Sequence, residues 1–178
     1  PNADGTSNQV IKTDASGNLS FGTKGKILSR ASSTMTNGDF AVTGTTGSIN
    51  TDLNTSITLS NANNKVLVVA NLRTQIEGGS NNNTRGQIEI LRDSTDIDSK
   101  FFGYYHVGGS DKNIYQEISF FIFDSPGDTN SHTYKVRANA DTSGVTVRML
   151  DATPGSGIYA THLHLMEFEV WFTIRYTL

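Results

Sequence analysis

Two histidines, His162 and His164, have the residue type and the spacing that could support metal chemistry. They are two positions apart, so in a strand both side chains point to the same face. Imidazole is a common ligand for transition metals, and a three-fold assembly would gather several such rings if that face pointed inward. No third ligand lies in the same segment. The sequence therefore favours a hydrogen-bonded or solvated pair, and we expect neither a metal nor another cofactor.

A second candidate is the acidic segment that contains Asp93, Asp96 and Asp98. Carboxylate oxygens bind calcium, but this segment lacks the regular ligand spacing and the turn glycine of a calcium loop. Solvated turn residues explain it better. No carboxylate pair is typical of the acid and nucleophile of a glycan-degrading enzyme, although such a pair can also form across subunits. The sequence favours a protein that is not an enzyme.

A third candidate is the aromatic group Phe101, Phe102, Tyr104 and Tyr105. Aromatic rings with a polar handle suit carbohydrate binding. Adjacent aromatic residues, however, place rings on both faces of a strand, which suits burial in a core and an interface. We expect burial.

The elements that position these residues are short strands separated by polar turns. No segment has the apolar period of a helix over ten or more residues. About ten strands at this spacing predict an all-β jelly-roll sandwich. We expect strands near residues 25–31, 39–43, 46–50, 55–60, 65–76, 85–92, 99–106, 113–123, 132–139, 145–150 and 158–170.

The stretch from Gln116 to Ala138 predicts an antiparallel hairpin with a long loop. Its first strand is apolar on both faces near its end, with Phe120 and Ile122 on one side and Phe121 and Phe123 on the other. A strand with a solvated outer face would alternate. Because no helix is available as a cover, the simplest cover is another copy of the chain.

Two further segments support a covered outer face. The strand at 65–76 begins with apolar residues on both faces, and the apolar residues of the last strand change parity after Leu165. Either a bulge lies near Leu165 and Met166, or the strand passes there from core to interface. The expected interface residues are Phe121, Phe123, Phe168, Val170, Phe172, Ile174 and Tyr176.

Five segments, taken in order, carry a resemblance to a known family. Phe123–Val136 reads Phe-Asp-Ser-Pro, a polar run, then Thr-Tyr-Lys-Val, and Leu163–Phe168 reads Leu-His-Leu-Met-Glu-Phe. The other three are Gly25–Leu28, Thr55–Val68 and Ile90–Ile97. Together they resemble the C-terminal heads of bacteriophage tail-fibre and virion structural proteins, particularly of marine phages. Those heads are similar to the trimeric jelly rolls of the tumour-necrosis-factor and complement families. This chain departs from the pattern at Asp93, where glycine is frequent, and by its tail beyond residue 170.

The resemblance implies a homotrimer with a fibre linker at 1–23 and a jelly-roll head at 24–170, while the apolar parity of the last strand predicts an interfacial strand extension at 171–178. The linker's few apolar residues cannot offset the cost of ordering it alone. The resemblance implies that neighbouring chains cover it, and the alternative is a flexible linker. The chain begins with Pro1, so we expect it to continue a larger fibre protein. The net charge of −3 argues against nucleic acid as a binding partner. The sequence shows no leader and no long apolar run, so we expect no membrane insertion.

The resemblance also implies a location on the virion, as a tail or surface fibre, and attachment to a host-cell receptor. The alternatives are a purely structural trimerisation or decoration domain and, less favoured, a glycan-degrading tailspike. Counting alternate loops back from the last strand predicts a receptor-facing end, away from the linker, that would bind a polar ligand such as a glycan. The predicted receptor residues are Asp93, Asp96, Asp124, Asp128, Asn130, Thr153 and Ser156.

Overall fold

The computed structural model describes residues 9–13, 16–23, 27–35, 40–43, 48–78, 83–105, 112–140, 144–150 and 161–169, and every regular element in these ranges is a strand. In this part of the chain no helix has the length and apolar character needed to cross a membrane. The strands are β1 (Gln9–Thr13), β2 (Leu19–Thr23), β3 (Ile27–Thr34), β4 (Phe40–Thr43), β5 (Ser48–Thr58), β6 (Lys65–Gly78), β7 (Asn83–Arg92), β8 (Thr95–Tyr105), β9 (Lys112–Asp124), β10 (Ser131–Ala140), β11 (Thr146–Met149) and β12 (His162–Phe168).

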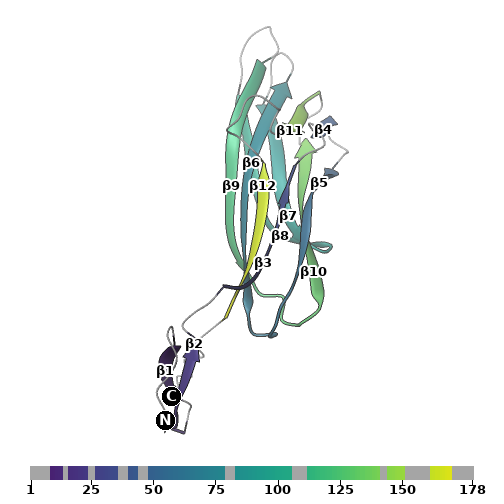
Figure 1. Cartoon of the computed structure of the whole chain (residues 1–178). Helices are drawn as coiled ribbons and strands as arrows, with labels where there is room; N and C mark the ends of the chain where they lie inside the picture. The colour runs from purple at the N-terminus through teal and green to yellow at the C-terminus, as the bar shows by residue number, and fades with distance from the viewer. Residues whose placement is uncertain are drawn as a thin grey trace, which may run out of the picture.

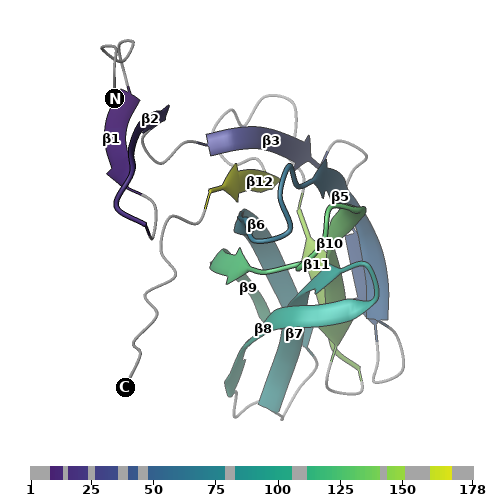
Figure 2. The ribbon, with the colours of Figure 1, turned by 90° about the horizontal axis from the view of Figure 1, so that it is seen from below.

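Two antiparallel sheets face each other, and a separate β1–β2 hairpin lies below them (Figure 1). One sheet has the order β5-β10-β7-β8, and the other contains β3-β12-β6 with β9 on the opposite edge of β6. With β4 and β11 set aside, the sheets follow the strand orders 2-7-4-5 and 1-8-3-6 of a jelly roll. Figure 2 shows the two layers from below. The predicted all-β jelly-roll sandwich is confirmed.

The core lies between the sheets and follows the strand period of two. In β6, β10 and β12 buried residues alternate with partly exposed ones, so each strand turns one face inward. Among the most deeply buried side chains are Phe120, Tyr134 and Leu163. Each large apolar side chain stabilises the fold by about 1.5–3 kcal/mol when fully buried. Lys100 of β8 reaches across the open edge of the sandwich, lies over the Phe120 ring and donates to the Ser119 carbonyl.

The expected hairpin between residues 113–123 and 132–139 is wrong. β9 pairs with β6, whereas β10 pairs with β5 and β7, so the two strands belong to opposite sheets. The connection between them is long enough to cross the sandwich. A tight turn would have required pairing, but a polar run of this length does not. The segments expected at 46–50 and 55–60 form a single strand, β5.

The last two strands run in the same direction, because both β11 and β12 pair antiparallel to the same edge of β6. The predicted loop count assumed a reversal between them, so its assignment of ends is wrong. We call the end where Ile27, Phe168 and Lys65 lie in register, one row from Asp124, the base. The linker enters at this base through β3, and the opposite end, where β6 ends at Gly78, is the far end.

The parity change in the last strand has a simple explanation. The pairing of β12 with β6 is regular from His162 to Phe168, so no bulge interrupts it on that side. Leu163, Leu165 and Glu167 point inward and are buried, while Met166 and Phe168 point outward. The register shift lies on the β3 side, between Met166 and Phe168. The strand therefore moves its apolar residues from the core face to the outer face.

A glycine in β8 permits the close pairing of β7 and β8. A Cβ atom on Gly103 would lie 2.0 Å from the Thr84 carbonyl oxygen, and backbone cannot yield as a flexible side chain does. We expect Gly103→Ala to lower the free energy of unfolding by about 3 kcal/mol. The control is Gly127→Ala, where the added Cβ meets nothing and only the positive φ of 83° costs about 1–2 kcal/mol. Equal losses in urea unfolding would contradict this explanation.

Candidate interaction surfaces

The outer face of the β9-β6-β12 sheet carries an apolar surface at its base. Register places Leu67 between Phe123 and Met166, and Val69 beside Phe121 in the next row. Phe121 is 72% exposed and Phe123 63% exposed, and the Phe123 ring meets Phe168 edge-on at 6.0 Å between centroids. We call this surface the apolar base patch; its residues are Leu67, Val69, Phe121, Phe123, Met166 and Phe168.

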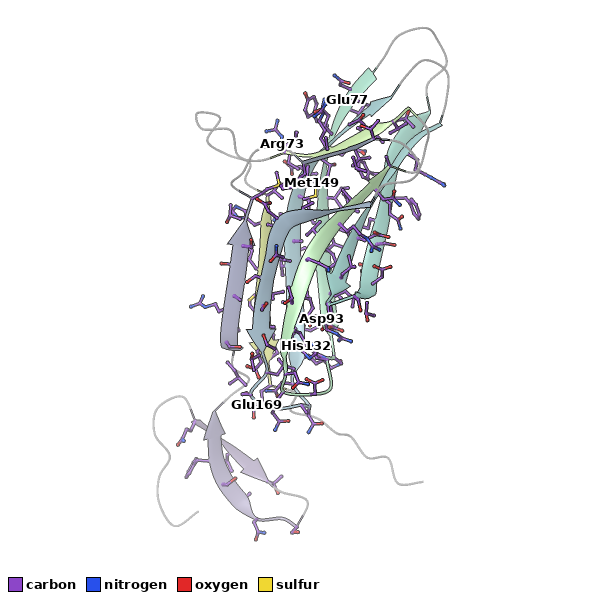
Figure 3. The ribbon with its side chains drawn as sticks, turned by 90° about the vertical axis from the view of Figure 1, so that its right-hand side faces the viewer. Arg73, Glu77, Asp93, His132, Met149 and Glu169 are labelled. Atoms are coloured by element: carbon purple, nitrogen blue, oxygen red, sulfur yellow. The ribbon has the colours of Figure 1, made fainter. Side chains whose placement is uncertain are left out.

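Toward the far end the same outer face becomes charged. Arg148 of β11 contacts Glu77 of β6 at 3.1 Å, and Gln75 donates to the same carboxylate at 2.9 Å. The Arg73 guanidinium lies 5.8 Å from the centre of the Tyr115 ring. Figure 3 shows Arg73 and Glu77 near the far end, away from the hairpin. The apolar character is therefore confined to the base half of the sheet.

The outer face of the other sheet is polar. Arg137 of β10 contacts Glu89 of β7 at 2.5 Å and Asp96 at 2.9 Å. Phe101 is an exposed large apolar residue of β8, and the Arg85 guanidinium lies 5.0 Å from the centre of its ring. The two outer faces thus differ in kind, and the one built on β9, β6 and β12 is the face suited to burial against another protein surface.

The predicted receptor residues that the structure describes lie at the base, next to the linker, and are engaged within the chain. Asp124 accepts two hydrogen bonds from Arg92, at 2.8 and 2.7 Å, and a third from the buried Tyr134 hydroxyl at 2.6 Å. Burial and the negative Asp124 carboxylate both raise the pKa of Tyr134, which stays a neutral donor. Asp96 belongs to the Arg137 ion pair. Thr153 and Ser156 lie outside the described residues.

His132 joins two of the base loops. Its Nδ1 lies 2.8 Å from Asp93 and its Nε2 lies 2.9 Å from Asp128. Asp93 also accepts from the Thr133 amide at 2.9 Å, and Asp128 accepts from the Asn130 amide at 2.7 Å. Figure 3 shows Asp93 and His132 together at the base. Asp93 has a φ of 55°, a left-handed conformation that aspartate tolerates and glycine prefers. We call these groups the His132 clamp.

The His132 clamp predicts a pH-dependent stability. The hydrogen bond to Asp93 raises the pKa of His132, burial opposes this, and Asp128 adds to the rise. Its stabilisation is therefore fully present below about pH 6.5, the unperturbed value, and is lost as the pH rises through the raised pKa. We expect His132→Ala to cost about 1–2 kcal/mol of unfolding free energy near pH 6, and less at pH 9.

Urea titrations of wild type and His132→Ala at several pH values measure this difference. The control is His164→Ala, which removes an exposed histidine from β12. The pKa values of Asp93 and Asp128 are lowered, mainly by the His132 bond and by the Asn130 amide, respectively. At acid pH the stabilisation by the His132 clamp must therefore fall again, because Asp93 and Asp128 become protonated. A cost of His132→Ala that does not change with pH would refute the clamp.

The two histidines of β12 do point to one face, as their spacing predicts. Their rings stack with centroids 5.6 Å apart, and His162 Nδ1 lies 2.9 Å from the Thr34 hydroxyl. Burial lowers the pKa of His162, and the nearby His164 adds to this. Within the described part of the chain no group of three or more histidine, cysteine or acidic side chains is placed to hold a metal ion.

The aromatic group on β8 is divided between two environments. Phe102 is buried against the core, whereas Phe101 is 57% exposed on the polar outer face. Burial is therefore confirmed for Phe102, whereas Phe101 is exposed in the single chain and its expected burial in an interface stays a prediction, because adjacent residues of a strand face opposite ways. The side chains of Tyr104 and Tyr105 lie outside what the structure describes.

Sequence reasoning gave no role to Glu167, which is 1% exposed at the end of β12. It accepts hydrogen bonds from the Ser29 hydroxyl at 2.9 Å, from the Ser60 amide and hydroxyl at 2.7 Å each, and from Asn64 Nδ2 at 2.7 Å. Burial opposes ionisation, but these donors together hold the pKa of Glu167 below its usual value. The signal available in the sequence was its parity, since Glu167 continues the inward face of Leu163 and Leu165.

The fold and these surfaces define a jelly-roll sandwich domain with one apolar outer face. The sequence matches no protein-family model and no curated protein. Among solved structures it is similar to the Eiger tumour necrosis factor from S. frugiperda, with 10% identity, a TM-score of 0.42, and 84% of this chain and 98% of that one covered.

Two further similar structures come from infectious bursal disease virus. The Gt strain structure has 10% identity and a TM-score of 0.30, and the match covers 89% of this chain and 44% of that one. The VP2 subviral particle has 11% identity and a TM-score of 0.33, with 89% and 43% covered. The chain thus spans less than half the length of these viral chains. At such low TM-scores these likenesses carry no information about function.

Proposed function

We propose that this chain forms a homotrimeric head domain of a virion fibre, in which three copies meet through the apolar base patch. The observation that carries the proposal is the outward exposure of Phe121 and Phe123 beside four other apolar residues, on a sheet that no helix covers within the described residues. Contiguous apolar patches of this kind mark interaction sites in soluble proteins. The resemblance of five ordered segments to phage fibre heads supports the choice of a virion and of three copies.

Attachment to a host-cell receptor is the finer part of the proposal, and it rests on the resemblance. The acidic base loops are unsuited to this role, because their carboxylates are held by Arg92, His132 and Arg137 and the loops lie at the end where the linker enters the head. A head on a fibre meets the cell with the end opposite its linker, so we propose the far end as the receptor-facing end. The role proposed is binding, without catalysis.

Competition with the parent virus tests attachment. Purified domain should reduce adsorption of the parent virus to its host, and substitutions at the base, such as Asp96→Ala, should leave that competition unchanged at a temperature where the domain is folded. A trimer that does not compete would favour the alternative, a structural trimerisation or decoration domain. Loss of viscosity in a host polysaccharide solution would instead reveal a depolymerase. Gold-labelled antibody against the domain, imaged on virions, tests the proposed location.

A further inference from the structure

The β1–β2 hairpin has an apolar face that nothing in the described chain covers. Its strands pair only with each other, and register places Ile11 opposite Phe21 and Thr13 opposite Leu19. Directly opposite residues share a face, and so do alternate residues of one strand. Ile11, Leu19 and Phe21 therefore lie on one face, with Ile11 62% and Leu19 53% exposed and Phe21 partly exposed. We call this the hairpin face.

An isolated two-stranded hairpin is at best marginally stable in water, and stability requires packing of its apolar face. The described part of the head does not provide this cover, because Ile11 and Leu19 stay more than half exposed and β1 and β2 form a sheet of their own below it (Figure 1). On the other face of the hairpin, the described side chain is that of Ser20, which is polar and exposed. The partner therefore binds on one side, and it is apolar.

The position of the hairpin indicates what this partner is. β2 ends at Thr23 and β3 begins at Ile27, so the connection spans at most about 14 Å. Ile27 is in register with Phe168, which belongs to the apolar base patch. Copies that meet through that patch must bring their hairpins close to one another. A short tether of this kind gives an effective concentration in the millimolar range, far above that of any separate partner.

We propose that the hairpin faces of the copies pack against one another below the heads, so that the shaft begins at Ile11, Leu19 and Phe21. This inference rests on the proposed function, since it needs the heads to associate. The occupant of each hairpin face is the same face of a neighbouring copy. The hairpin then gains its stability from the assembly of the heads and extends their contact toward the base.

Cross-linking tests this placement cleanly because the chain contains no cysteine. Leu19→Cys places a thiol on the hairpin face, and its neighbour Ser20→Cys places one on the opposite face. With a short bismaleimide, Leu19→Cys should give covalently joined chains at least about ten times faster than Ser20→Cys. The rates are compared at equal protein concentration, after native mass measurement has shown that both variants remain trimeric.

Trimeric heads in which Leu19→Cys links no faster than Ser20→Cys would overturn the inference and leave the proposed function intact. A single-chain mass for wild type would overturn both. Hydrogen exchange adds a second readout, in which amides of Gln9–Thr13 and Leu19–Thr23 should lose protection when Phe121→Asp/Phe123→Asp separates the heads. Retained protection in the separated chain would also overturn the inference, because the cover would then come from the same chain.

Discussion

Replacing Phe121 and Phe123 with aspartate is expected to convert the assembly into single folded chains. Each ring contributes about 1.5–3 kcal/mol when buried, so losing both weakens association by about two to four orders of magnitude per chain. Placing unpaired carboxylates in an apolar interface adds a further desolvation cost. Both side chains point outward from β9, away from the core residues Ile118 and Phe120, so the fold of the single chain should remain. Sedimentation velocity at micromolar concentration measures the change.

A matched control exists on the other sheet. Phe101 has an exposure of 57%, close to the 63% of Phe123, but it lies on the polar outer face of β8. Phe101→Asp should leave the assembly intact. If Phe101→Asp dissociates the chains and Phe121→Asp/Phe123→Asp does not, the interface lies on the sheet that contains β8, and the proposed interface is wrong. Circular dichroism of each variant checks that dissociation has not come from unfolding.

The second large effect is expected at Glu167. Replacing it with alanine leaves donors from Ser29, Ser60 and Asn64 without their acceptor in a buried site. An unsatisfied buried group costs about 1–3 kcal/mol, so the total loss in unfolding free energy should reach about 3–5 kcal/mol. Urea unfolding at one fixed protein concentration measures this loss, since association adds to apparent stability.

The effect of Glu167 also has a defined pH dependence. Because its folded pKa lies below the usual value, its stabilisation is present above the unfolded pKa and is lost as the pH falls through the folded one. Glu167→Gln should therefore cost less as the pH approaches 3 than it does at pH 7. Glu117→Ala, at an exposed position of β9, is the control and should change stability by less than about 0.5 kcal/mol. A loss at Glu117 equal to that at Glu167 would contradict the structural role.

The two-faced strands are where sequence reasoning succeeded. The residues Phe120 and Phe121 are neighbours of similar chemistry, yet their parity alone assigned them to opposite faces, and the structure buries the first and exposes the second. The same reasoning held for Val68 and Val69 on β6. A period of two is a local property of the chain, so it is readable without knowledge of the fold. The partner that covers the outer face is not local, and it stays a prediction.

Pairing and direction were harder to predict because they depend on distant segments. β9 and β10 are consecutive in the sequence, but β9 pairs with β6 and β10 pairs with β5, so the two strands lie in different sheets. Likewise, nothing in the sequence near Leu150 or Thr161 shows that β11 and β12 run in the same direction along β6. The reversal that the loop count assumed between these two strands placed the predicted receptor loops at the wrong end.

The residues that carry the family resemblance turn out to be bonded to one another. Arg92, Asp124 and Tyr134 come from two of the resembling segments, and the structure joins them in one cluster at the base. Asn64 and Glu167 come from two others and share a hydrogen bond. Polar residues within these patterns therefore tie loops together, which is a structural reason for their presence. Sequence alone shows that these residues are polar but not which of them bond to one another, and Asp124 was therefore expected to face a receptor.

The most direct test of the central claim is the mass of the wild-type domain in solution. Light scattering behind a sizing column, at micromolar concentration, should give the mass of three chains, and Phe121→Asp/Phe123→Asp should give the mass of one. Dilution should move the wild type toward the single chain without loss of its circular dichroism. A wild-type domain that stays a single folded chain at tens of micromolar, with Phe121 and Phe123 still exposed to solvent, would contradict the account.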